Sequence, residues 1–319
     1  DGALYVTHPN ALGSTNGMTE VDSMAGAHLN LRGDINVAEP FLIIGQRPGA
    51  QHSIYNVSGS NTLSGPITRK LGSTGFRLHL ASGTTLIVRG GLIGPGGSGW
   101  YVIRNNGKLL AFYDKPIIIA SSDIVFFEAL GTTVLGVSGN VWGQTKINST
   151  GTLRTDVPNA LPESSTLVIE HANTTLDLNG FDQSISGIVN PCTGTITSAT
   201  PATLTVDQEA AATLASRLTG AVGLLKAGSA TLTLSNDLNT TTGDITVTNG
   251  TLAVALENSL GNSTNITVSG ATARLELRAS GGISDAAALK IADDGAKVNL
   301  LTGVNETVGW LYLGDKMQR

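Results

Sequence analysis

Charged side chains are scarce in this chain. Asp, Glu, Lys and Arg make up 13% of its 319 residues, about half of the roughly 25% that is usual in soluble domains. Apolar residues nevertheless reach 40%, which excludes the low hydrophobicity and high net charge of disordered chains. The sequence has no basic cluster that would favour nucleic acid, and no apolar run approaches the roughly 18 residues of a membrane-spanning helix. The composition therefore indicates a folded chain that neither binds nucleic acid nor spans a membrane.

Cysteine and, over a long stretch, aromatic residues are also missing. Cys192 is the only cysteine, so no internal disulfide can form; for a secreted protein of this size, that favours bacterial export. No Phe, Tyr or Trp occurs between Phe181 and Trp310, although aromatic rings usually supply much of a globular core. The core of that stretch must therefore come from Leu, Ile, Val and Ala, which favours regular stacks of aliphatic side chains.

The sequence is rich in short runs of alternating aliphatic and polar residues, separated by Gly, Asn, Ser or Asp. Successive side chains of a strand point to opposite faces, so each run predicts a strand with one buried aliphatic face and one Thr- or Asn-rich face in water. Clear runs lie at residues 84–88, 166–170, 174–178, 202–206, 230–234, 244–248, 251–255, 265–269, 273–277 and 296–300.

These runs recur every 18 to 28 residues when they are anchored on aliphatic residues from Leu86 to Val298. Such a period is typical of repeat architectures in which each repeat contacts only its neighbours. We therefore expect an all-β fold, a parallel β-helix (β-solenoid) of about 13–14 coils; the handedness follows from the family resemblance given below. It should form a single domain over residues 1–319, more irregular over 1–145 and regular over 146–319. The glycine-rich segment 90–100 is expected to be a loop, and segment 207–218 either a short helix or a pair of strands.

The expected fold assigns two sets of residues. Inward leucines of successive coils should stack as a core ladder, formed by Leu153, Leu176, Leu204, Leu232, Leu252 and Leu275. Corners that need a positive φ should use Gly or Asn, and the candidate asparagines are Asn173, Asn179, Asn249 and Asn262.

Four segments of the repeat region resemble a known family. They are INSTGTLRT (147–155), TLVIEHANTTLDLNGFDQSISGI (166–188), LLKAGSATLTLSNDLNTTTGDITVTNGTLAV (224–254) and LGNSTNITVSGATARLEL (260–277). They are similar to the autotransporter-associated β-strand repeat, also called the passenger-associated transport repeat. Its theme is L-x-K-x-G-x-G-T-L-x-L, a Thr/Gly turn and T-x-V-x-x-G-T-L; Ala230 stands where the theme prefers Gly. The resemblance implies a right-handed β-helix carried outside a bacterial cell, and it implies no particular activity.

No residue pattern predicts catalysis, a metal or a cofactor. Asp293 and Asp294 precede Gly295 without the further His and Arg motifs of a pectinase-like site, so we expect a turn there. The five histidines are scattered, and none has the close spacing of a metal-ligand pair. Four carboxylates could hold structural calcium at corners, although the repeats that bind calcium in other solenoids are missing. They are Asp123, Glu128, Asp156 and Asp177.

Three functions stay open on the sequence alone. The first is structural: an extracellular rod, fibre subunit or stalk segment of a bacterial surface protein, cell-surface or outer-membrane associated, which self-associates end to end or continues into a longer chain. The second is an adhesin or polysaccharide-binding passenger domain, in which Trp100, Tyr101 and Trp142 stack on sugar rings; alternatively, these rings fill the core. The third, by fold analogy only, is a carbohydrate-active enzyme. We favour the structural function and expect no enzyme activity.

A cell-recognition motif is also spelled out in the first part of the chain. Arg32, Gly33 and Asp34 form an integrin-type tripeptide inside LNLRGDINV, which alternates as a strand. Recognition would require an exposed loop, so we do not expect adhesion through this tripeptide.

Overall fold

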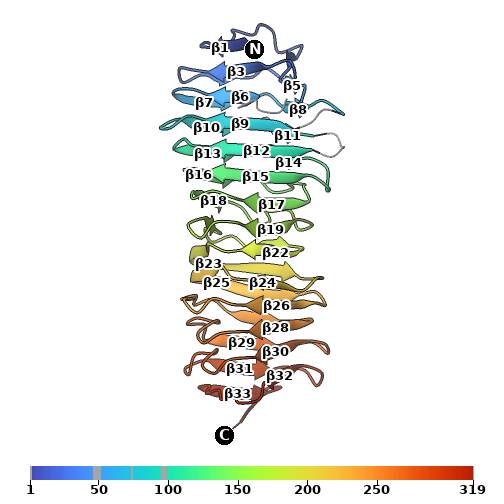
Figure 1. The fold of residues 1–319 in the computed structure, drawn as a ribbon, viewed down its shortest axis with the longest axis vertical. Helices are drawn as coiled ribbons and strands as arrows, with labels where there is room; N and C mark the ends of the chain where they lie inside the picture. The colour runs from blue at the N-terminus through green and yellow to red at the C-terminus, as the bar shows by residue number, and fades with distance from the viewer. Residues whose placement is uncertain (1, 46–51, 73–74, 95–98, 319) are drawn as a thin grey trace. The chain divides into compact units, whose positions relative to one another are not determined.

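The computed structural model describes residues 2–45, 52–72, 75–94 and 99–318, so residues 95–98 of the glycine-rich segment lie outside the described residues. In these ranges the chain is all-β without a helix, and parallel strands stack as a β-solenoid of about 13 turns (Figure 1). The predicted fold class is confirmed. The chain divides into two compact units, unit 1 (residues 1–165) and unit 2 (residues 166–319). Each is described by itself below, and the single-domain organisation stays a prediction.

Unit 1 is built from three sheets of parallel strands, and each coil contributes one strand to most of them. The first sheet contains, in order, β1 (Gly2–Val6), β3 (Ala27–Leu31), β6 (Ile54–Asn56), β9 (Phe76–Leu80), β12 (Trp100–Asn105), β15 (Ile124–Ala129) and β17 (Gln144–Ile147). The second contains β4 (Asn36–Val37), β7 (Ser60–Leu63), β10 (Thr85–Val88), β13 (Leu109–Phe112), β16 (Thr132–Leu135) and β18 (Thr152–Thr155). The third contains β2 (Thr19–Val21), β5 (Phe41–Ile43), β8 (Ile67–Arg69), β11 (Leu92–Ile93) and β14 (Ile117–Ile118).

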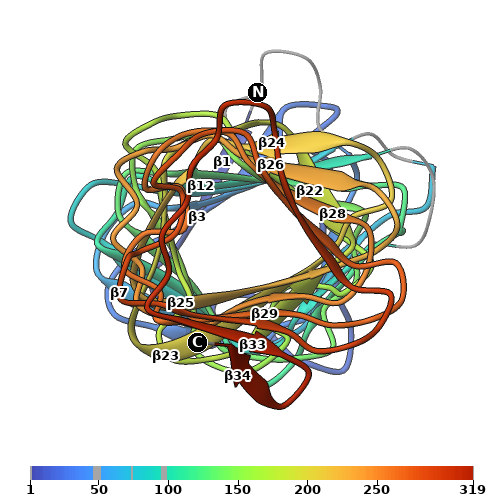
Figure 2. The same cartoon turned by 90° about the horizontal axis from the view of Figure 1, so that it is seen from below.

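Unit 2 is also built from stacked strands, and its two longest strands have 13 and 11 residues. Its first strands are β19 (Thr166–Ile169) and β22 (Gly187–Cys192), which pair with each other. Its long sheet contains β20 (Thr175–Asp177), β21 (Gln183–Ile185), β23 (Thr195–Asp207), β25 (Arg217–Ala227), β27 (Ile245–Val247), β29 (Asn265–Val268), β31 (Ala288–Ile291), β33 (Trp310–Leu313) and β34 (Lys316–Gln318). Its second sheet contains β24 (Ala212–Leu214), β26 (Thr231–Leu234), β28 (Thr251–Val254), β30 (Arg274–Leu277) and β32 (Lys297–Leu300). Seen end on, β25 and β29 lie on one side of the coil, and β24, β26 and β28 on the other (Figure 2).

Two details of unit 2 correct or extend the sequence analysis. Segment 207–218 contains no helix: it includes the end of β23, all of β24 and the start of β25. Its alanines therefore follow the strand pairing of the neighbouring coils, which overrides their helix propensity. The last strand, β34, folds back antiparallel on β33 and covers an edge of the long sheet.

The core consists of the inward side chains of every coil. The six leucines of the predicted ladder are all buried, as expected, but they belong to more than one ladder. Leu232, Leu252 and Leu275 are consecutive partners on β26, β28 and β30, whereas Leu204 and Leu176 lie in two ladders of the long sheet, and Leu153 lies on β18 in unit 1. The prediction of a single ladder was wrong because the leucines chosen from the sequence lie on different sheets of the coil.

The register of the strands gives the true length of a coil. Partner residues lie 20 apart for Leu232 and Leu252 and 26 apart for Val37 and Leu63. The 28-residue spacings of the sequence analysis are therefore longer than these repeats.

Each fully buried aliphatic side chain contributes roughly 1.5–3 kcal/mol of transfer free energy.

Buried amide side chains join successive coils at the corners. Asn239 Oδ1 accepts a hydrogen bond from the Leu218 N–H at 2.8 Å, and its Nδ2 donates to the Ser259 carbonyl at 2.7 Å. These partners lie one coil before and one coil after Asn239. The amide therefore satisfies backbone groups that the turn would otherwise leave buried and unpaired.

Glycines take most of the strained corner positions. Of the four asparagines predicted there, only Asn179 has a positive φ, of 51°. Asn249 and Asn262 instead lie beside Gly250 and Gly261, which both have a φ of 61°. A Cβ on Gly250 would also lie 2.6 Å from the Gly228 carbonyl oxygen, so both conformation and space require glycine.

Candidate functional site

The three aromatic residues predicted to bind sugar have different surroundings. Tyr101 and Trp142 are fully buried, so neither ring can stack on an external ligand, and the core-filling alternative holds for both. The Trp142 indole N–H donates to Thr145 Oγ1 at 2.8 Å, which satisfies its polar atom inside the core. Trp100 is partly exposed, and the guanidinium of Arg77 lies 5.7 Å from the centre of its ring. Of the three, only Trp100 is available to a ligand.

Tyr101 belongs to a charged cluster inside unit 1. Arg69 Nε donates to the Tyr101 hydroxyl at 2.5 Å, and Arg69 also lies 3.6 Å from the carboxylate of Asp123. The Gly99 N–H donates to the other oxygen of Asp123 at 3.0 Å. Burial raises the pKa of Tyr101, and its hydrogen bond to Arg69 opposes this effect. Each charge has a partner, as buried charges require, so the cluster is a structural feature of the core.

The outward face of the first sheet of unit 1 carries a column of neighbouring rings, which we call the histidine column: His28, His52, Tyr55 and His79. The His52 ring lies 4.6 Å from His28 and 4.5 Å from Tyr55, and Tyr55 stacks on His79 at 4.7 Å, centre to centre. Neither ring nitrogen of His52 has a hydrogen-bond partner within the described ranges.

Burial and neighbouring charges keep two of these histidines neutral. Burial is the main cause that lowers the pKa of His52 to about 4, and His28, His79 and Arg77 add to it. Burial likewise lowers the pKa of His79 to about 4, with further lowering by Arg104 and Arg77 and an opposing effect of Glu128. The sequence analysis missed this column, although His28, His52 and His79 are spaced by 24 and 27 residues, close to one coil.

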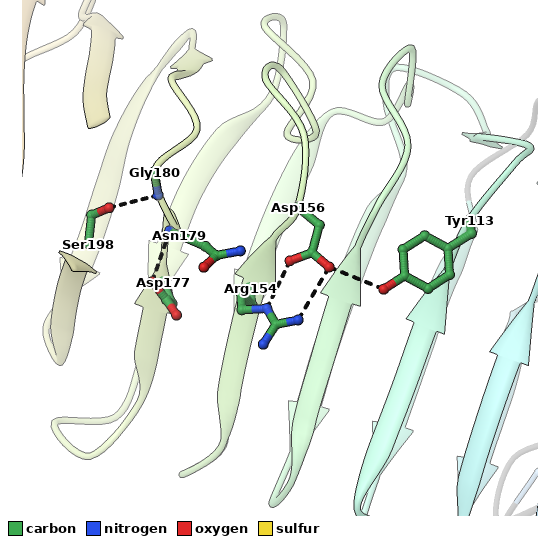
Figure 3. Close-up of polar contacts among 7 residues, drawn as sticks. All are labelled: Tyr113, Arg154, Asp156, Asp177, Asn179, Gly180 and Ser198. Atoms are coloured by element: carbon green, nitrogen blue, oxygen red, sulfur yellow. Dashed lines mark hydrogen bonds and ion pairs between the residues drawn. The ribbon is translucent and has the colours of Figure 1, made fainter. Parts of the chain in front are cut away.

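The four carboxylates considered for calcium are all engaged by protein groups. Asp123 is held in the buried cluster, and Glu128 pairs with Arg104 at 2.5 Å. Asp156 accepts hydrogen bonds from Arg154 Nε at 2.9 Å and the Tyr113 hydroxyl at 3.1 Å, and Asp177 accepts one from the Asn179 N–H at 2.9 Å (Figure 3). The part of the chain that the structure describes contains no group of three or more His, Cys, Asp or Glu side chains that could hold a metal ion.

The Arg-Gly-Asp tripeptide lies in an exposed turn between β3 and β4, and not within a strand. Gly33 and Asp34 have φ values of 95° and 60°, which break the strand. Both charged groups have neighbours in unit 1. Asp34 Oδ1 accepts a hydrogen bond from the Ser60 N–H at 2.5 Å, and the Arg32 guanidinium lies 4.2 Å from the centre of the Tyr5 ring. The predicted strand was wrong because glycine and aspartate tolerate this corner.

Comparisons with protein-family models, curated proteins and solved structures gave no match to this chain. The likeness to the autotransporter-associated repeat therefore rests on the sequence segments alone. Among the described residues, no helix is long and apolar enough to cross a bilayer.

Proposed function

We propose that the chain is a structural segment of a bacterial surface protein, a rod, fibre subunit or stalk exposed outside the cell. The observation that supports this proposal most strongly is the way each coil is joined to the next. In each unit, strand ladders, inward aliphatic columns and buried amides all join consecutive coils. Such a stack is quasi-one-dimensional, which suits a spacer or a fibre.

The outward faces of unit 2 fit the same proposal. Thr205, Thr246 and Thr267 occupy outward positions of the long sheet, and Thr213 and Thr233 do so in the second sheet. Threonine combines high β-propensity with a polar hydroxyl, so these flat faces stay wettable with few charges. The proposed partner is a second copy end to end, or further coils of a longer chain.

Electron microscopy of the native protein at several concentrations tests this proposal. We expect rods whose length grows with concentration, or one long rod where the coils continue in the parent chain. Sedimentation velocity over the same concentrations provides an independent measure of association. Particles that stay short and monomeric at the highest concentration, with no longer parent chain, would argue against a fibre or stalk. Protease treatment of intact producing cells tests the location, because an exposed segment is cleaved without lysis.

A second candidate function is binding of glycans by unit 1. It is favoured by one observation, the partly exposed Trp100 beside Arg77 on the same sheet face as the histidine column. Rings of this kind stack on the apolar faces of sugars. Loss of glycan binding in the Trp100→Ala variant, measured on a glycan array, tests this function.

A further inference from the structure

A polar hollow opens in unit 1 beside the ends of β12, β15 and β17. Its volume is about 390 Å³, and its lining consists of Arg104, Asn106, Glu128, Leu130, Asn148 and Ser149. These residues come from three consecutive coils, each one coil apart in sequence. The hollow therefore exists only because the coils stack, and no single segment of the sequence contains it.

The hydrogen-bonding groups of this hollow are unevenly satisfied. Arg104 Nε donates to Glu128 Oε2 at 2.7 Å, and another nitrogen of the same guanidinium contacts that same oxygen at 2.5 Å. Glu128 Oε1 has no donor among the described residues. The side-chain oxygen Oδ1 of Asn148 is buried and also lacks a donor there. Glu128 Oε1 is therefore open to a donor from outside the protein, and Asn148 Oδ1 can accept one once its amide turns toward the hollow.

Charge narrows the kind of ligand that could supply those donors. A carboxylate or sulfate would bring only acceptors to Glu128 Oε1 and Asn148 Oδ1. A cationic ligand would meet the guanidinium of Arg104, which already neutralises Glu128. A neutral molecule with several hydroxyl groups fits both acceptors without either conflict.

The hollow also has an apolar surface beside these polar groups. Leu130 lines the hollow and is 62% exposed, which leaves an aliphatic surface next to the polar groups. A sugar ring has hydroxyls at its edge and C–H groups on its face, and it can therefore use both kinds of surface at once.

We propose that this hollow binds a neutral sugar ring of a glycan. Glu128 Oε1 accepts a hydrogen bond from a ring hydroxyl, and the amide of Asn148 turns so that its Oδ1 accepts another. Leu130 packs against the C–H face of the ring. Arg104 acts as a positioning residue, because its two contacts hold Glu128 Oε2 and leave Oε1 directed to the ligand. His79 supports the rim, since its Nε2 lies 3.2 Å from Asn106 Nδ2. The site gives the glycan-binding function a substrate class and does not depend on the rod function.

The test uses the full chain with neutral oligosaccharides of glucose, galactose and mannose, and with uronic-acid oligosaccharides of the same length. Binding is measured by saturation-transfer NMR and by calorimetry. We expect binding of at least one neutral series, weakened about tenfold in Asn148→Ala and in Glu128→Gln. Leu130→Ala should weaken it several-fold, and since this side chain is exposed, the variant keeps its fold. The matched control is Glu276→Gln, which alters an Arg278-paired carboxylate of unit 2 at 2.7 Å and should bind like the parent.

Three results would overturn the proposal: no binding of any neutral oligosaccharide, binding of uronic-acid oligosaccharides alone, or neutral binding that the variants leave unchanged. Thermal melts of each variant identify any that fail to fold, and Leu130→Ala then decides the outcome. The rod function is judged separately by microscopy, so the two proposals can fail independently.

Discussion

Acid should destabilise unit 1 through the histidine column. Near pH 8, His52 and His79 are neutral in both the folded and the unfolded chain, so they add almost no pH dependence there. Between pH 6.5 and about 4, His52 and His79 gain a proton only on unfolding, because their folded pKa values are lowered to about 4. The unfolded state then binds more protons, so the free energy of unfolding must fall as the pH falls through this window.

The pKa shift of each histidine determines how much folding stability is lost in acid. A histidine whose pKa moves from 6.5 to about 4 loses about 2 kcal/mol of folding stability between pH 8 and pH 5. Both rings keep some contact with water, so we halve this value to about 1 kcal/mol each. His28, Arg77, Arg104 and Glu128 are the charged or titratable neighbours that act on His52 and His79. The two histidines together should therefore contribute about 2 kcal/mol.

The double variant His52→Phe, His79→Phe keeps the ring packing and removes both titrations. Urea denaturation at pH 5, 6.5 and 8 should show a smaller loss of stability on acidification than in the parent, by about 2 kcal/mol. A Trp310→Phe background restricts tryptophan fluorescence to Trp100 and Trp142, both in unit 1. His171→Gln, an exposed histidine of unit 2, is the control. If the double variant and the parent lose the same stability between pH 8 and pH 5, protonation of His52 and His79 is not the cause of the acid destabilisation.

Three further predictions concern buried polar groups of unit 2. Asn239→Leu removes the bridge between Leu218 and Ser259 and should lower the free energy of unfolding by about 2–4 kcal/mol, as measured by urea denaturation; a loss below about 0.5 kcal/mol would argue against the bridging role. Lys226 Nζ donates to carbonyls that include Gly228 O at 2.8 Å, and Lys226→Met leaves these carbonyls without their donor. We expect the melting temperature, measured by calorimetry, to fall by several degrees. An unchanged melting temperature would contradict this prediction. Cys192 is buried with its pKa raised to about 11 by burial, so a thiol reagent should label it only as the chain unfolds, and fast labelling of the native protein at pH 7 would contradict its placement.

Much of the fold was predictable because a strand needs only local information. The alternation at Leu232 and Leu234 on β26 follows from burial of one face, and this pattern is visible in five residues. The fold class and the approximate number of coils then follow from counting such strands. The division of inward residues among ladders was not predictable, because it depends on which sheet of the coil each strand joins. Leu176 and Leu232 have the same local pattern and lie on different sheets.

The candidate site was predicted poorly because local pattern does not determine burial in the irregular half. Trp100 and Tyr101 are neighbours in sequence, and the alternation of β12 directs one ring outward and the other into the core. Sequence analysis treated them as one group. It also evaluated each histidine within its own segment, where no close pair exists, and so missed contacts between residues one coil apart.

In a solenoid, the useful neighbours of a residue lie one coil away, about 20 to 26 positions along the chain here. Residues 104, 128 and 148 follow this rule: they are spaced by 24 and 20 residues and meet in the hollow. The same rule groups His28, His52 and His79, where a search for spacings of a few residues finds nothing. Polar side chains that recur at the coil spacing are therefore the pattern from which sites of this fold can be predicted, and short-range motifs are not. Applied to unit 2, the rule pairs Asn265 with Ala288 and Trp310 at steps of 23 and 22. The exposed indole of Trp310 thus has the apolar Ala288 as its partner in this column, and we expect its replacement by alanine to leave glycan binding unchanged.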